Sequence, residues 1–173
     1  ESLVFDIKNH IVSYSPNIII LQVGIVDCYP RALSMQEMQI LSRIPMINSI
    51  SKYLVKKFYK TIVRRRNLAY VNIKEFEKNL EEIKFSFPDA QWIVVPIGPP
   101  NIAYQEKNPL IKERIESYNR ILERVFTNSF LSSLFCKTDF ETLYLDDHHH
   151  LSRFGHCHLA ERISRELSKL LIN

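Results

Sequence analysis

The chain has 173 residues, of which 46% are hydrophobic and 24% are charged, and its formal net charge is +4. These proportions are those of one globular domain and exclude a disordered, collagen-like or disulfide-rich protein. No apolar run reaches the ~18 residues that a membrane span requires. Three cysteines, at no metal-like spacing, are expected to be reduced thiols, which favours a cytoplasmic location.

The first half of the chain alternates helical and strand patterns. Hydrophobic residues at helical spacing predict a helix over residues 3–14. The β-branched run 18–23 predicts a strand buried on both faces, as in a parallel sheet. Ser34, followed three residues later by Glu37, predicts a capping box at the start of a helix. A second helical stretch is expected over about 46–63.

The second half continues the alternation. Asn72 is expected to cap a helix, and residues 92–97 predict a second buried strand. Asn108 is expected to cap a long amphipathic helix with proline at its first position. Residues 134–136 predict a third strand, and Ser152 is expected to cap the final helix. The inward face of that helix is expected to hold Cys157, Ala160, Ile163, Leu167 and Leu170. Strands separated by helices indicate an α/β fold with a parallel sheet.

The segment from Asp147 to His150 carries the sharpest chemical signal. A carboxylate three residues before a histidine can fold back onto the imidazole, fix its tautomer and prepare it as a general base. The alternative is a solvated, histidine-rich loop. A metal site is a third reading, because five of the six histidines lie within eleven positions of the chain. No metal is predicted, since consecutive histidines rarely all reach one ion.

Candidate ligand-binding residues follow both buried strands. Ligands in open α/β sheets bind at the carboxyl ends of the strands, where these residues should meet. They are Gly24, Val26, Asp27 and Arg31 after the first strand, and Asn101 after the second. The alternative is a pair of rigid turns, with Asp27 capping the local backbone.

Together these segments resemble the SGNH (GDSL-type) hydrolases, a group of serine esterases, lipases and carbohydrate acyl esterases. Asp147-x-x-His150-Leu151-Ser152-x-x-Gly155 is similar to the family's last block, which supplies the catalytic Asp and His. Gly24-Ile25-Val26-Asp27 stands where the family has Gly-x-Asn-Asp. The resemblance implies a three-layer, flavodoxin-like parallel sheet with helices on both faces over residues 1–173. It also implies Asp147 and His150 as catalytic residues, an ester substrate, and no cofactor.

Two departures from the family pattern qualify this hypothesis. No Gly-Asp-Ser occurs, and only 23 residues precede Gly24. The chain is therefore expected to lack the first ~50 residues of the domain, with the nucleophile outside it. Ser2 opens a helix with no strand before it and is not expected to be that nucleophile. Val26 replaces the family's oxyanion asparagine, and losing one such donor costs about 10²–10³ in rate. An inactive module that binds glycan or a membrane surface is the alternative.

Residues 34–70 are expected to form a basic helical insertion within this single domain. Residues 52–66 contain seven Lys and Arg and no acid, with aromatic and aliphatic residues interleaved. Such a helix can present a solvated face, lie on an anionic membrane or contact nucleic acid. We expect no nucleic-acid partner, because a net charge of +4 is low for that role. The expected partner is a small-molecule or carbohydrate ester, and the sequence leaves the oligomeric state open.

Overall fold

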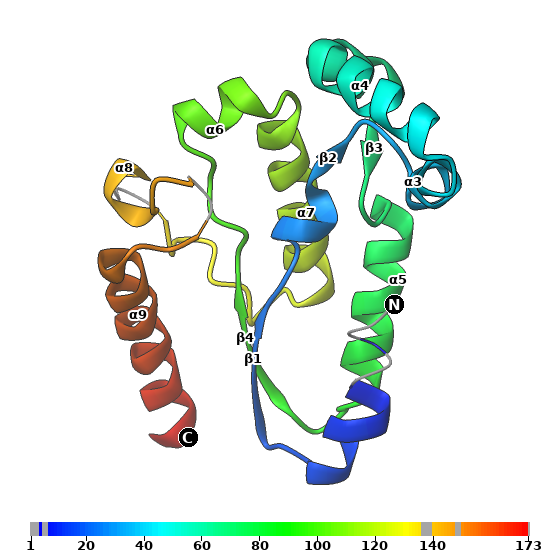
Figure 1. Ribbon diagram of the computed structural model, residues 1–173. Helices are drawn as coiled ribbons and strands as arrows, with labels where there is room; N and C mark the ends of the chain where they lie inside the picture. Colours follow the sequence, from blue (N-terminus) through cyan, green and yellow to red (C-terminus); the bar gives the residue numbers. More distant parts are fainter. Residues whose placement is uncertain (1–3, 5–6, 136–139, 148–149, 173) are drawn as a thin grey trace.

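The protein has a mixed α/β fold around a two-stranded parallel sheet, seen in a computed structural model (Figure 1). The structure describes residue 4 and residues 7–135, 140–147 and 150–172. β1 (Ile18–Gln22) and β4 (Gln91–Val95) run parallel, with Ile18 opposite Gln91 and Gln22 opposite Val95.

Helices make up most of the rest of the described chain. They are the π-helix Ile7–Ile11, the 3₁₀ turn Val12–Tyr14, α2 (Ile25–Cys28), α3 (Met35–Ser42), α4 (Pro45–Arg66), α5 (Ile73–Phe85), α6 (Ile102–Lys107), α7 (Ile111–Val125), α8 (Phe140–Leu143) and α9 (Arg153–Ile172). A short antiparallel pair joins β2 (Pro30–Arg31) to β3 (Leu68–Ala69). Within the described residues, no helix is both long enough and apolar enough to cross a bilayer.

Helices lie on both sides of the parallel pair (Figure 1). α5 and α7 contribute Phe76, Leu80 and Leu122 to a core that also contains Trp92 and Val94 of β4. α9 packs on the opposite side, against β4. A smaller cluster there joins three buried side chains: Val95, Leu134 and Leu159.

The predicted helix starts are confirmed at three positions. The Ser34 hydroxyl accepts a hydrogen bond from the Glu37 amide, and the Glu37 carboxylate accepts one from the Ser34 amide, completing the capping box of α3. Asn72 caps α5. The Ser152 hydroxyl accepts from the amide of Gly155 at the start of α9. Each cap satisfies backbone donors that the first helical turn leaves without a partner.

The third strand lies elsewhere than predicted. Residues 134–135 form a turn, and residue 136 is outside the described residues. Instead, Val94 makes a single parallel bridge with Phe130. The Leu131 amide donates to the Val94 carbonyl at 3.0 Å. The side chain of Leu134 is buried, so its apolar signal reflects packing in the smaller cluster and not strand pairing.

Two helix predictions also need correction. Asn108 ends α6, and α7 begins at Ile111, after Leu110 in the left-handed region. On α9, Cys157 and Ala160 are exposed, whereas Gly155 and Leu159 are buried. Gly155 packs closely against the end of α8, and this contact decides which face of α9 is buried. The hydrophobic pattern of the sequence does not reveal such a contact.

The parallel α/β class is confirmed at this coarse level, but a three-layer flavodoxin-like sheet is not. The sheet of the described chain has two strands and one further bridge. β1 was expected to be buried on both faces, yet Ile20 is 46% exposed. α9 packs on β4 and leaves this part of β1 accessible to solvent.

Candidate active site

Asp147 and His150 form the close pair that their spacing predicts. Asp147 Oδ2 lies 2.6 Å from His150 Nδ1, and Asp147 Oδ1 accepts a hydrogen bond from the His150 amide at 2.9 Å. The carboxylate thus fixes both the backbone and the ring of His150. When Nδ1 donates to Asp147, Nε2 is the ring nitrogen that can accept a proton. The side chains are 68% and 41% exposed for His150 and Asp147, so a substrate can reach them.

A short turn between α8 and α9 presents this pair. Tyr144 and Leu151 form an antiparallel bridge, and the Leu145 amide donates to the His150 carbonyl at 2.8 Å. The Ser152 amide donates to the Leu143 carbonyl at 2.8 Å. These bonds hold the two ends of the turn together, at Leu145 with His150 and at Leu143 with Ser152.

Gly155 permits the close approach that anchors this turn. A Cβ at Gly155 would lie 2.3 Å from the Leu143 carbonyl oxygen, a distance that no real side chain tolerates. The Ser152 hydroxyl also donates to the Thr142 carbonyl at 2.6 Å. α9 therefore begins in direct contact with α8, and the Asp147–His150 turn lies between them.

A pocket of about 490 Å³ near the carboxyl end of β1 is lined by Asp147 but not by His150. Its lining residues are Ile25, Val26, Tyr29, Arg31, Tyr104, Lys107, Asn108 and Asp147. Of the five predicted substrate-binding residues, Val26 and Arg31 line this pocket. Val26 is 61% exposed, and the Arg31 guanidinium stacks 4.0 Å from the ring centre of Tyr70.

Gly24 and Asp27 lie behind the pocket lining. Gly24 is buried with φ of 109°, and a Cβ there would lie 2.5 Å from Ile97 Cδ1. Burial raises the pKa of Asp27, and hydrogen bonds from the backbone of Asp27 and Gly24 act in the opposite direction. These two residues shape the turn after β1. Their role in substrate binding stays a prediction.

Asn101 also lies outside this pocket. Its side chain is buried and caps α6 by accepting from the Tyr104 amide at 2.9 Å. It lines a different pocket, between the Pro99–Pro100 turn and α7. Asn101 therefore contributes to the pocket beside Asp147 only indirectly, because it caps α6 and so positions Tyr104 in the pocket wall. Its direct contact with a substrate stays a prediction.

A polar network that the sequence did not reveal forms one wall of the pocket. The Tyr29 hydroxyl donates to Asn108 Oδ1 at 2.7 Å, and Asn108 Nδ2 donates to the Tyr104 carbonyl at 3.2 Å. The Tyr59 hydroxyl lies 3.5 Å from the same Asn108 oxygen. Burial raises the pKa of Tyr104, so its phenol stays protonated and can donate. The nearest sequence signal is the Asn108–Pro109 pair, which predicts the start of the next helix and not the end of α6.

The histidine cluster gives no metal arrangement in the part of the chain that the structure describes. His148 and His149 lie outside that part. His158 Nε2 is 2.9 Å from the Leu134 carbonyl, and its ring stacks with Phe154. The described residues contain no group of three or more potential metal-ligating side chains.

Comparisons with protein-family models, with curated proteins and with solved structures found no match. The resemblance to the SGNH hydrolases therefore rests on the motifs of this sequence.

Proposed function

We propose that the protein is a serine-type acyl ester hydrolase or acyltransferase, with acylated carbohydrates among its candidate substrates. The observation that carries the proposal is the 2.6 Å contact between Asp147 Oδ2 and His150 Nδ1 beside a pocket. A carboxylate on Nδ1 is the arrangement that makes imidazole a general base in Ser-His-Asp enzymes. Both side chains are partly exposed, at 68% for His150 and 41% for Asp147, so an ester can approach the pair.

In the proposed reaction, a serine from outside these 173 residues attacks the ester carbonyl. His150 takes the serine proton through Nε2 and returns it to the oxygen of the departing alcohol. Asp147 orients His150 and stabilises the imidazolium. Water, or the hydroxyl of an acceptor, then attacks the acyl-enzyme and releases the acyl group. Ser2 is outside the described residues, and we do not assign it this role.

The proposal includes the finer fold, a three-layer sheet of the SGNH type. The parallel β1–β4 pair, the parallel bridge at Phe130 and helices on both sides support it. In such a fold the catalytic groups gather at the carboxyl ends of the strands. The pocket beside Asp147 lies near those ends, because Ile25 and Val26 directly follow the turn after β1.

The oxyanion of the tetrahedral intermediate needs hydrogen-bond donors. Val26 supplies no side-chain donor, but Tyr104, Lys107 and Arg31 line the same pocket. A buried phenol that stays protonated is a competent donor, and removal of one oxyanion donor costs about 10²–10³ in rate. We therefore place Tyr104 first among the groups that could take the role of the family's asparagine.

The test uses the full-length protein and an aryl acetate ester. His150→Ala should abolish hydrolysis, whereas His156→Ala should leave it unchanged, because His156 is an exposed histidine one turn into α9. Circular dichroism establishes that both variants are folded. Full activity in folded His150→Ala would refute the assignment. A fluorophosphonate probe, followed by peptide mass spectrometry, identifies the nucleophilic serine.

One observation favours a second candidate, an inactive relative that binds glycan or a membrane surface. Val26 is 61% exposed at the position of the family's oxyanion asparagine. A folded wild-type protein that neither hydrolyses the ester nor reacts with the probe would favour this candidate. Retained binding of an acylated oligosaccharide under the same conditions would then identify the pocket as a recognition site.

A further inference from the structure

The positive charge of the chain is concentrated in one segment, residues 34–70. This segment contains eight Lys and Arg against one acid, Glu37. The remaining residues contain 15 Lys and Arg against 18 acids, a net charge of −3. The overall charge of +4 is therefore the sum of +7 on this segment and −3 on the rest of the protein. Such asymmetry points to an anionic partner for this segment.

The inner side of α4 packs against the rest of the protein. Val63 is fully buried, Val55 and Ile62 are half-buried, and the Tyr59 hydroxyl donates to the Pro30 carbonyl at 3.0 Å. Tyr59, Ile62 and Val63 lie at helical spacing after a kink of α4 at Phe58, and Val55 lies before that kink. The helix is therefore fixed to the body of the protein through these side chains, and its other sides face solvent.

A row of large apolar side chains faces solvent on another side of α4. Ile47, Ile50, Leu54 and Phe58 follow one another at spacings of three, four and four residues. They are 43%, 55%, 46% and 47% exposed, respectively. Single exposed hydrophobic residues are common, but a continuous exposed row marks an interaction surface.

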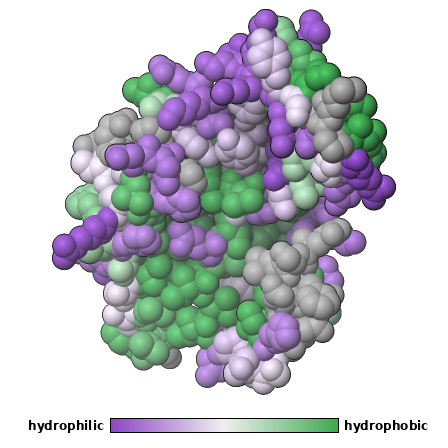
Figure 2. Space-filling model, viewed as in Figure 1, coloured by the Kyte–Doolittle hydropathy of each residue, from purple (hydrophilic) through white to green (hydrophobic). Residues whose placement is uncertain are grey.

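α3 extends the apolar surface. Its exposed hydrophobic residues are Met35, Met38 and Ile40, and Ile44, between α3 and α4, is exposed as well. Figure 2 shows hydrophobic side chains at this edge of the molecule, over α3 and α4, beside hydrophilic ones. We refer to these residues and Ile47, Ile50, Leu54 and Phe58, with Lys52, Lys56, Lys57 and Lys60, as the α3–α4 surface.

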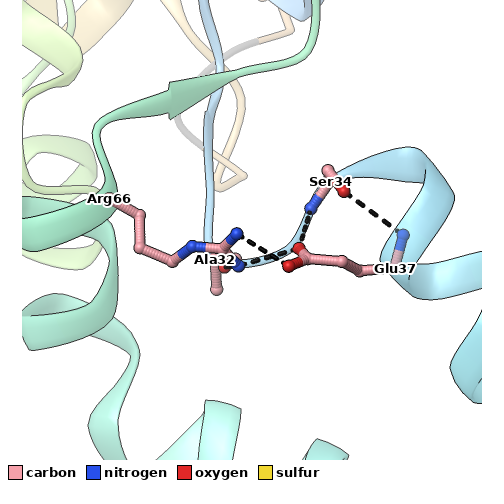
Figure 3. A network of polar contacts seen from close by, with 4 residues as sticks. All are labelled: Ala32, Ser34, Glu37 and Arg66. Atoms are coloured by element: carbon pink, nitrogen blue, oxygen red, sulfur yellow. Dashed lines mark hydrogen bonds and ion pairs between the residues drawn. The ribbon is translucent and has the colours of Figure 1, made fainter.

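A polar network fixes α3 to the end of α4 (Figure 3). Glu37 accepts two hydrogen bonds from the Arg66 guanidinium, at 2.7 and 2.8 Å, and one from the Ser34 amide. Arg66 also donates to the Ala32 carbonyl at 2.9 Å. The one acid of the segment is thus paired with Arg66 and does not neutralise the lysines of α4.

We propose that the α3–α4 surface docks on a bilayer that contains anionic lipids, with the helices lying in the plane of the headgroups. Apolar side chains enter the boundary between headgroups and acyl chains. The exposed lysines of α4 contact the lipid phosphates, and among them Lys57 lies over the ring of Phe58. The phosphates of a nucleic acid could pair with the lysines, but Ile50, Leu54 and Phe58 would then stay exposed to water. The combination of an apolar row with a net charge of +7 therefore favours a lipid surface.

The test measures how the full chain co-sediments with vesicles of phosphatidylcholine, with and without phosphatidylserine. We expect binding that needs phosphatidylserine and weakens as salt is added. In Lys56→Gln/Lys57→Gln/Lys60→Gln the partition coefficient should fall about 10²-fold, since each surface lysine contributes about fivefold. The matched control Lys74→Gln/Lys78→Gln/Lys112→Gln removes three exposed lysines elsewhere and should fall by less than about threefold.

A second variant tests the apolar row. Phe58→Ser should weaken binding to the vesicles about fivefold, because the exposed half of the Phe58 side chain would be buried in the bilayer. This loss should be the same at every salt concentration, since apolar burial involves no charge. Phe85→Ser is the control, because Phe85 is 86% exposed on α5. Phe58 is 47% exposed and Phe85 is 86% exposed, so neither belongs to the buried core and both variants should stay folded.

Four results would overturn the proposal: equal binding to pure phosphatidylcholine, equal losses in the controls, tighter binding to a DNA duplex, or self-association that covers the surface. None of these measurements involves an ester. Failure here would therefore leave the proposed hydrolase activity unaffected, and loss of that activity would leave the vesicle result unaffected.

Discussion

The contact between Glu37 and Arg66 should make the attachment of α3 depend on charge. Hydrogen bonds from the Arg66 side chain, and then from the Ser34 backbone, lower the pKa of Glu37 from 4.5 to about 2. Glu37→Gln removes the charge but keeps an oxygen for the Ser34 amide, because Gln also serves in a capping box. Glu37→Ala removes both functions. The pair of variants therefore separates the ion pair from the cap.

The expected magnitude follows from the exposure of the two side chains. The lowered pKa corresponds to about 3 kcal/mol if it is converted directly. Both side chains are more than a third exposed, 36% for Arg66 and 39% for Glu37, so solvent screens most of that energy. We expect Glu37→Gln to cost about 1 kcal/mol at neutral pH. Glu37→Ala should cost about 2 kcal/mol, because loss of the cap adds roughly 1 kcal/mol.

The sign of the pH dependence is determined by the direction of the shift. A carboxylate with a depressed folded pKa stabilises the fold above its unfolded pKa of 4.5, and this contribution is lost as pH falls toward about 2. Urea denaturation and hydrogen exchange of the α3 amides should therefore separate wild type from Glu37→Gln above pH 4.5. The two proteins should converge as the pH approaches 2.

Glu75→Gln is the matched control. Glu75 occupies the same position on α5, but its carboxylate accepts from the Asn72 amide group and not from a guanidinium. The control should therefore change stability less than Glu37→Gln does. The reasoning would be refuted if the difference in the free energy of unfolding between wild type and Glu37→Gln were constant with pH or grew as the pH falls.

Three further predictions concern the candidate site. Asp147→Asn should lower ester turnover roughly 10⁴-fold with little change in melting temperature, because the imidazole loses the carboxylate on Nδ1; unchanged turnover would contradict the pairing. Gly155→Ala should lower the free energy of unfolding by about 1–3 kcal/mol, because its Cβ would meet the Leu143 carbonyl. Alanine usually favours a helix over glycine, so a stabilised Gly155→Ala protein would show that α8 and α9 are not in close contact. Val26→Asn, at an exposed position, should raise turnover by up to about 10² if an oxyanion donor is missing, and steady-state kinetics would show no gain if Tyr104 already supplies it.

Short sequence motifs predict the local structure correctly where that structure depends on residues close together in the chain. The Ser34–Glu37 box and the Asp147–His150 pair each span three residues, and both form as predicted. Their geometry follows from side chains that satisfy nearby backbone donors. The catalytic role of the pair stays a prediction, because a contact distance does not by itself show turnover.

Features that depend on distant residues were missed. Tyr29 and Asn108 are separated by 79 positions and meet only because α6 folds over the turn after β1. α6 has six residues, too few for a helical period to stand out. Asn-Pro is compatible with both the end of one helix and the start of the next, and α7 begins after it. The face of α9 was misplaced because Gly155 packs against α8, a contact that has no hydrophobic signal.

The carbonyl oxygen of the Asn108 side chain connects two parts of the molecule. It accepts from Tyr29 in the pocket wall, and it lies 3.5 Å from the Tyr59 hydroxyl on α4. That hydroxyl has one proton, which it gives to the Pro30 carbonyl at 3.0 Å. A displacement of α4 toward Asn108 would redirect the Tyr59 hydrogen bond from the Pro30 carbonyl to an oxygen that already accepts from Tyr29. The pocket wall and α4 therefore meet at one amide oxygen, which accepts from Tyr29 and lies within reach of Tyr59.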